Sequence, residues 1–327
     1  MRHYLASRDL IAEDTKFAYA GRSPCKIEAE SLSQALQAEP AIVPSLRAEP
    51  MSFPMDQAVV LGGLLLWLYL PTLDHLVLQW WRDPNFSHGF FVPLFSGFVI
   101  WQERAQLRRI PLCPAWSGIW IVILGLCLLM LGQLGAEIFL ARISLLFVLA
   151  GLTILFCGWM LFRAILFPLA FLVIMFPLPA IVFNQITFPL QIFASKVAST
   201  ILPWLGVPIL REGNVILLPA MPLEVADACS GIRSLMSLAT LAIIYGYLMD
   251  RRISIRILLA LAAIPIAVAA NSLRVVITGL LVQYWDPDKA QGFFHEFQGW
   301  LMFVASLAML YLLHKAILIL WPEKIPA

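Results

Sequence analysis

The chain has 327 residues, of which 61% are hydrophobic and 13% charged, and its net charge is +2. Its mean hydropathy of +0.85 excludes a soluble domain with a polar surface. The composition therefore indicates a polytopic membrane protein. The small net charge is spread over loops and gives no nucleic-acid-binding patch.

Residues 1–50 are the most polar part of the chain. They hold 13 of the 42 charged residues and lack the apolar core of a signal peptide. We expect residues 1–55 to form a flexible cytoplasmic extension. Initiation at Met51 or Met55 is the alternative, in which case the extension is not translated. The transmembrane domain is expected over residues 56–325.

Eight apolar segments qualify, or nearly qualify, as membrane spans, because a span needs about 20 mostly apolar residues. They are roughly residues 57–78, 89–102, 117–135, 138–160, 163–183, 230–249, 256–283 and 297–320. The second is short and its ends are poorly defined. The predicted fold is therefore an all-α membrane domain of about eight helices.

Basic residues predict the orientation of these helices. With eight spans, nine basic residues fall on one side: Arg104, Arg108, Arg109, Arg163, Arg251, Arg252, Arg256, Lys315 and Lys324. The opposite side holds Arg82, Lys196, Arg211 and Lys289. Both termini are then cytoplasmic, and residues 184–228 form the largest outer segment.

This outer insert changes character along its length. Residues 185–202 are less apolar than a span and predict a helix lying at the membrane interface. Residues 207–218, with a turn-like Arg-Glu-Gly-Asn at 211–214, predict a β-hairpin, and residues 223–226 a third extended piece. A small β element would thus lead directly to Cys229.

Cys229 is the best nucleophile candidate in the chain. The five cysteines show no paired or metal-type spacing, which suggests neither a disulfide framework nor a metal site. Cys229 alone borders a polar outer region, at the expected N-terminus of a helix, where the helix dipole and Arg233 favour a thiolate. Asp227 opposes this charge or caps the helix. The alternative is a cysteine that only packs.

Two further residues at later spans come out on the same side. Arg274 lies within the span 256–283, about 15 Å along the helix from Tyr284, and a charge at that depth is functional by default. The alternative is an arginine that snorkels or pairs structurally, for example with Asn271. His295, at the outer start of the last span, can exchange a proton with a thiol or a leaving group, or it is an ordinary interfacial residue. His88 is the rival outer histidine.

At these residues the chain resembles the exosortase/archaeosortase family of membrane transpeptidases. The resemblance is carried by Ala-Cys-Ser-Gly-Ile-Arg-Ser at 228–234, by Asn271 with Arg274, and by His295 with Gly-Trp at 299–300. It is supported by Ser-His-Gly-Phe-Phe-Val-Pro at 87–93 and by the Arg-Glu-Gly-Asn turn. It covers about residues 57–320, and the histidine is similar to that of the bacterial exosortase branch.

The resemblance implies a Cys229, Arg274 and His295 site, supported by Arg233, Asn271, His88 and Ser230, with no metal or cofactor. It implies secreted substrates with C-terminal tails made of a Pro-Glu-Pro-type motif, a transmembrane helix and a basic cluster, cleaved at the outer face of a bacterial inner membrane. The acceptor is open; a lipid- or glycan-linked molecule is one candidate.

Three other readings stay open on the residues alone. A transporter or flippase for a lipid-linked or anionic glycan would use Arg274 and Arg233 and make Cys229 incidental. A non-catalytic subunit of exopolysaccharide export would tolerate changes at every candidate. A serine protease using Ser230 or Ser234 lacks supporting motif spacing.

Overall fold

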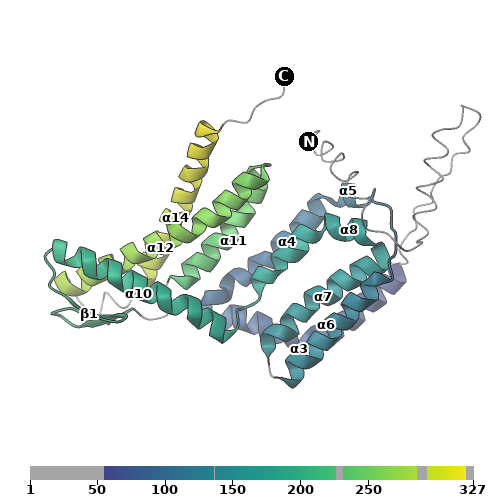
Figure 1. Ribbon diagram of the computed structural model, residues 1–327, viewed down its shortest axis with the longest axis horizontal. Helices are drawn as coiled ribbons and strands as arrows, with labels where there is room; N and C mark the ends of the chain where they lie inside the picture. The colour runs from purple at the N-terminus through teal and green to yellow at the C-terminus, as the bar shows by residue number, and fades with distance from the viewer. Residues whose placement is uncertain (1–54, 136, 226–230, 286–292, 322–327) are drawn as a thin grey trace, which may run out of the picture.

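The computed structural model describes residues 55–135, 137–225, 231–285 and 293–321. The chain is an assembly of long helices with one small antiparallel sheet at its edge (Figure 1). The elements are α3 (Met55–Arg82), η3 (Pro84–Phe90), α4 (Phe91–Gln102), α5 (Arg104–Leu107), α6 (Ser117–Leu134), α7 (Ile138–Cys157), α8 (Trp159–Ala164), α9 (Leu166–Phe171), η4 (Leu172–Met175), α10 (Ala180–Trp204), β1 (Leu210–Glu212), β2 (Val215–Leu217), β3 (Pro222–Glu224), α11 (Ile232–Met249), α12 (Ile253–Tyr284) and α14 (Phe293–Leu320).

Six helices of the described chain are long and apolar enough to cross a membrane: α3, α6, α7, α11, α12 and α14. The predicted all-α polytopic membrane fold is confirmed, but the count of eight spans is not. The predicted second span is helix α4, whose 12 residues extend only about 18 Å, less than the hydrocarbon thickness of a bilayer.

The predicted fifth span, 163–183, is not one continuous helix. It is divided into α8, α9 and η4, and the pair Leu166–Met175 and Ala180–Trp204 is bent by 75° at a short break. The break contains Pro177 and Pro179, which cannot donate a backbone hydrogen bond and which drive the preceding residue out of the helical region. Accordingly Phe176, which precedes Pro177, has extended backbone. The helix predicted at residues 185–202 is α10, which begins at Ala180, inside the predicted span.

The helices meet at two opposite ends of the molecule. At one end the Tyr247 hydroxyl donates to Glu103 Oε1 at 2.8 Å, joining the last turn of α11 to the end of α4. The Arg252 guanidinium donates to the Trp321 carbonyl at 2.8 Å, joining the start of α12 to the end of α14. Successive long segments alternate between this end and the other, so the basic loops after α4, α7 and α11 gather here (Figure 1). We call this the basic end.

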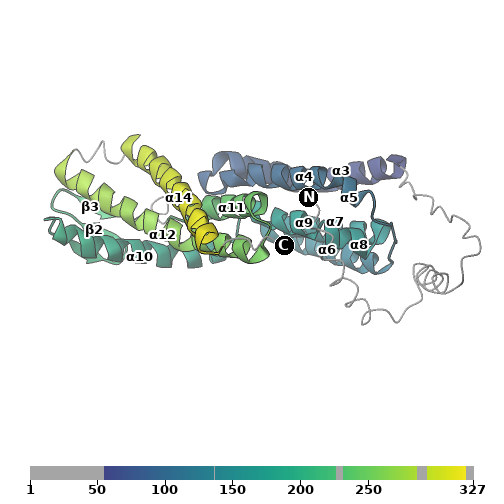
Figure 2. The same cartoon turned by 90° about the horizontal axis from the view of Figure 1, so that it is seen from above.

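The opposite end carries the sheet and α10. Strands β1, β2 and β3 pair in chain order, with Glu212 opposite Val215 across a turn of two residues. The predicted hairpin is confirmed, although Arg211 and Glu212 belong to the strand rather than the turn. Ile216, Leu223 and Val225 pack against α10 and the C-terminal part of α12. Figure 2 shows the sheet, α10 and α12 together on one side of the molecule.

The cysteines depart from expectation at one position. Cys113 is disulfide-bonded, whereas Cys127 and Cys157 are free thiols.

Candidate functional site

Residues 226–230 lie outside the described chain, so Cys229, Ser230 and Asp227 are located only through their neighbour Gly231. Gly231 is the N-cap of α11 and has φ +80° and ψ 0°, in the left-handed region that favours glycine. Its carbonyl accepts the Leu235 amide at 2.8 Å and the Ser234 hydroxyl at 2.9 Å. Helix α11 therefore begins immediately after the cysteine motif.

Gly231 lies directly against the side chain of Asn271 on α12. A Cβ built on Gly231 would come within 2.7 Å of both Cβ and Cγ of Asn271. No side chain larger than hydrogen fits this contact without displacement. The glycine of the cysteine motif and the asparagine of the Asn271/Arg274 pair thus form one packed contact.

Arg274, one turn along α12 from Asn271, contacts helix α14 at Gly299. A Cβ built on Gly299 of α14 would lie 3.6 Å from Cζ and 3.7 Å from both Nη atoms of Arg274. The guanidinium therefore lies over the open surface that Gly299 leaves. Thr278 and Gln298 support the same helix pair, with Thr278 Oγ1 3.0 Å from Gln298 Oε1 in a buried contact.

Arg274 lies in the C-terminal half of the long helix α12. Helix α12 has 32 residues, or about 48 Å, which exceeds the roughly 30 Å hydrocarbon core. Its C-terminal part packs against α10 and the sheet through Val275, Val276 and Val282. Arg274 is about 15 Å along the helix from Tyr284, as the sequence predicts, and about 32 Å from Ile253 at the basic end.

His295 belongs to the first turn of α14, and its side chain lies outside what the structure describes. Its backbone position is one turn before Gly299, and residues four apart share a helix face. The helix face on which His295 lies therefore includes the glycine that Arg274 covers. The structure thus brings together Gly231 at the start of α11, Asn271 and Arg274 of α12, and Gly299 near the start of α14, while Cys229 and the His295 side chain lie outside the described residues.

Arg233 and His88 fall at the same end but point to different neighbours. The Nε of Arg233 donates to Oδ1 of Asn85 in η3 at 3.3 Å, which fastens the start of α11 to the segment before α4. His88 is 6% exposed, and burial lowers the pKa of its imidazole, although backbone groups of Ile174 and Asn85 oppose this shift. Its described environment is therefore a buried position beside η4 rather than the Arg274 contact.

Arg142 is a polar residue of this end that sequence reasoning did not single out. It is 4% exposed, its Nε has no hydrogen-bond partner in the described chain, and it lines a cavity with Asn85 and Glu137. The sequence signal for Arg142 is a charged residue four positions inside an apolar span. A charged residue within a span is functional by default, and this criterion, which identified Arg274, applies equally to Arg142.

A family model for transmembrane exosortases matches residues 80–312. This range includes the cysteine motif, the Asn271/Arg274 pair and the start of α14. No curated protein and no solved structure matches the chain. The family model alone spans well over half of the sequence, and on this ground the chain belongs to the transmembrane exosortase family.

Proposed function

We propose that the chain is a membrane-embedded cysteine protease and transpeptidase that removes C-terminal sorting tails from secreted proteins. Membership of the exosortase family supports a membrane protease or transpeptidase role in general. The observation that carries the specific proposal is the convergence of helices α11, α12 and α14, with Gly231 packed on Asn271 and the Arg274 guanidinium over Gly299.

Cys229 is the proposed nucleophile. It lies three residues before Ile232, the first helical residue of α11, so unpaired amides of the first turn and the helix dipole would stabilise a thiolate. A thiolate rather than a thiol attacks a carbonyl. Arg233 adds a positive charge to the first turn of α11, and its side chain donates to Asn85 in the neighbouring η3.

The proposed reaction passes through a thioester. The Cys229 thiolate bonds to the carbonyl carbon of the scissile peptide, and Arg274 stabilises the oxyanion that forms. When the intermediate collapses, the C–N bond breaks and the amine of the tail leaves with a proton from His295. Water or an acceptor nucleophile then attacks the thioester carbonyl and gives its proton to His295, and the C–S bond breaks, which releases the acyl product and restores the Cys229 thiolate. Arginine stays protonated in almost any environment, so histidine is the proton carrier.

The proposed substrates are secreted proteins with a Pro-Glu-Pro-type motif, a transmembrane helix and a basic cluster. The clustering of basic residues at one end of the helices supports a cytoplasmic position for that end, with both termini cytoplasmic. The site would then face the periplasm at the bacterial inner membrane. A tail inserted with its basic cluster inside would present its motif beside Cys229, and transfer would go to a lipid- or glycan-linked acceptor.

Trapping the acyl-enzyme tests the proposal. The full chain is co-expressed with a tail-bearing reporter, and intact mass is measured for the enzyme and for the released reporter. Wild-type protein should carry the acyl fragment on Cys229, and Cys229→Ala should insert normally but leave the tail uncleaved. Cys127→Ala is the matched control, because Cys127 is an exposed free thiol of α6.

The outcome separates this function from transport. A flippase that uses Arg274 would keep its activity in Cys229→Ser and lose it in Arg274→Ala, with no tail cleavage in any variant. Normal cleavage by Cys229→Ala would exclude the cysteine mechanism.

A further inference from the structure

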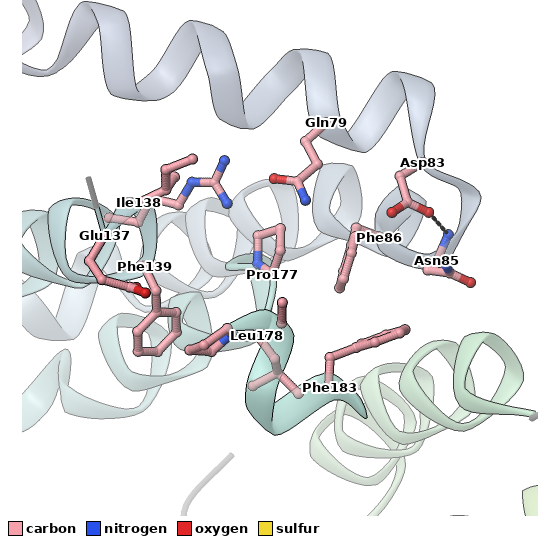
Figure 3. Close-up of a pocket in the computed structure, with 13 residues that line it drawn as sticks. Gln79, Asp83, Asn85, Phe86, Glu137, Ile138, Phe139, Pro177, Leu178 and Phe183 are labelled. Carbon is pink, nitrogen blue, oxygen red and sulfur yellow. Dashed lines mark hydrogen bonds between the residues drawn. The ribbon is translucent and has the colours of Figure 1, made fainter. Parts of the chain in front are cut away.

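A cavity of about 440 Å³ opens at the same end of the molecule as the cysteine motif (Figure 3). It lies between the end of α3, the start of α7 and the Pro177–Pro179 break before α10. Its walls are mixed: the rings of Phe86, Phe139 and Phe183 and two prolines lie beside polar and charged side chains. This volume is within the range of pockets that bind small ligands.

Arg142 is the charged group buried in this wall. Its side chain is 4% exposed, and its Nε makes no hydrogen bond to the described residues. Neither Asp83 nor Glu137, the carboxylates that line the cavity, forms an ion pair with it in that part of the chain. A buried cation without a counter-ion is strongly unfavourable. Binding an anion in the cavity would remove this unfavourable term.

Two helix N-termini add to the positive potential. Helix α7 begins at Ile138 and helix α10 at Ala180, and both residues line the cavity. Neither helix has a side-chain cap, since Glu137 and Pro179 make no capping hydrogen bond. Uncapped N-termini present free amide donors and the positive end of the helix dipole, a combination that binds anions.

The remaining polar groups limit the charge of that anion. Asp83 is already engaged, because its Oδ1 accepts the Asn85 amide at 2.9 Å, and Glu137 is exposed on the other side of the cavity (Figure 3). Gln79 supplies a neutral amide. The two carboxylates repel a dianion such as free phosphate about twice as strongly as a group of single charge.

The cavity is also joined to the cysteine motif. Asn85 lines it and accepts the Nε of Arg233, which is four residues from Cys229. Phenylalanine and proline walls around a single cation suit an extended peptide with one carboxylate among apolar residues. We propose that this cavity is a recognition subsite for a carboxylate side chain of the peptide substrate, with Arg142 as its counter-ion. The identity of that peptide as a sorting tail rests on the proposed function.

The test compares two reporters whose tails differ only by Glu or Gln at one motif position. Wild-type protein should cleave the Glu tail at least about tenfold more efficiently in kcat/KM, because the Gln tail leaves Arg142 without a counter-ion. Arg142→Met should lose this preference, and Arg142→Lys should keep part of it. Arg82→Gln is the matched control, since Arg82 is exposed at the same end and does not line the cavity.

Glu137→Gln provides a second variant that does not disturb buried packing. Removing this exposed negative charge should lower KM for the Glu tail and leave KM for the Gln tail unchanged. Equal cleavage of both tails by wild-type protein, or an unchanged preference in Arg142→Met, would overturn the subsite. If wild-type protein cleaves neither tail, it is the proposed function that fails.

A competing anion is tested with lipid. Phosphatidylglycerol added to the detergent-solubilised enzyme should not compete with the Glu tail. If it raises KM for both tails equally, and this effect disappears in Arg142→Met, the cavity binds a phosphate headgroup and the peptide assignment is overturned.

Discussion

The Gly231→Ala substitution should separate the geometry of the site from its chemistry, because it changes no group that takes part in the proposed reaction. A methyl group at this position meets two obstacles. The backbone φ of +80° is unfavourable for any residue with a Cβ, and that Cβ would lie 2.7 Å from two atoms of Asn271. The start of α11 and Asn271 must therefore move apart.

The expected cost follows from these two terms. The left-handed backbone contributes about 1–2 kcal/mol. Displacement of a packed neighbour contributes about 1–3 kcal/mol more, so the total is about 2–5 kcal/mol. Gly213→Ala is the matched control, since Gly213 has φ +64° but nothing within 4 Å of a built Cβ. It should cost only the backbone term, and the difference between the two variants measures the contact with Asn271.

The assay combines thermal unfolding in detergent with the rate of tail removal. Gly231→Ala should melt below Gly213→Ala and should cleave on the order of 100-fold more slowly, since displacing a reacting group by about 1 Å has an effect of this size. Gly213→Ala should cleave at the wild-type rate. If the two variants melt alike and Gly231→Ala cleaves normally, the packing of the cysteine motif on α12 is not part of the site.

Three further predictions concern other positions. Gly299→Ala should be tolerated, because the added Cβ would be in ordinary contact with Arg274 at 3.6 Å, whereas Gly299→Leu should displace the guanidinium and slow cleavage by at least about tenfold. Burial lowers the pKa of His88, so the stability that the neutral imidazole contributes is fully present above the ordinary histidine pKa of 6.5 and is lost as the pH falls below 6.5. The melting temperature measured from about pH 7.5 to about pH 5.5 should show this decline, and His88→Gln should flatten it. Burial alone would raise the pKa of Asp250, but hydrogen bonds from Arg252 outweigh burial and lower the pKa, so the carboxylate stabilises the fold at neutral pH. Asp250→Asn should therefore reduce the free energy of unfolding by about 2 kcal/mol at pH 7 without changing the cleavage rate at the opposite end of the molecule.

Helical spans and the β-hairpin follow from local sequence patterns. Long apolar runs predict α6, α7 and α11 because a membrane helix satisfies its own backbone. The hairpin at β1 and β2 follows from Gly213 between two β-branched stretches. The convergence of Gly231, Asn271 and Gly299 was expected only through alternating topology and a family resemblance, because contacts between separate helices have no local signature.

Other features depend on tertiary packing and could not be predicted in this way. Pro177 and Pro179 each permit either a kink or a break, and packing of the flanking segments decides between them. The overshoot of α12 beyond a bilayer depends on the sheet and α10 packing beside it. The cavity at Arg142 is formed by three segments distant in sequence, so only the position of an arginine within an apolar span was visible.

Proximity of Cys229 to His295 is the central claim, and cysteine cross-linking tests it directly. In a chain with the other four cysteines replaced, His295→Cys should form a disulfide with Cys229 on mild oxidation, since such a bond requires Cβ atoms within about 4.5 Å. Lys196→Cys, in helix α10, is the control and should not cross-link. Rapid cross-linking of the His295→Cys protein alone is the predicted result. Absence of the cross-link in properly inserted protein, or equal cross-linking of both variants, would contradict a common Cys229, Arg274 and His295 site.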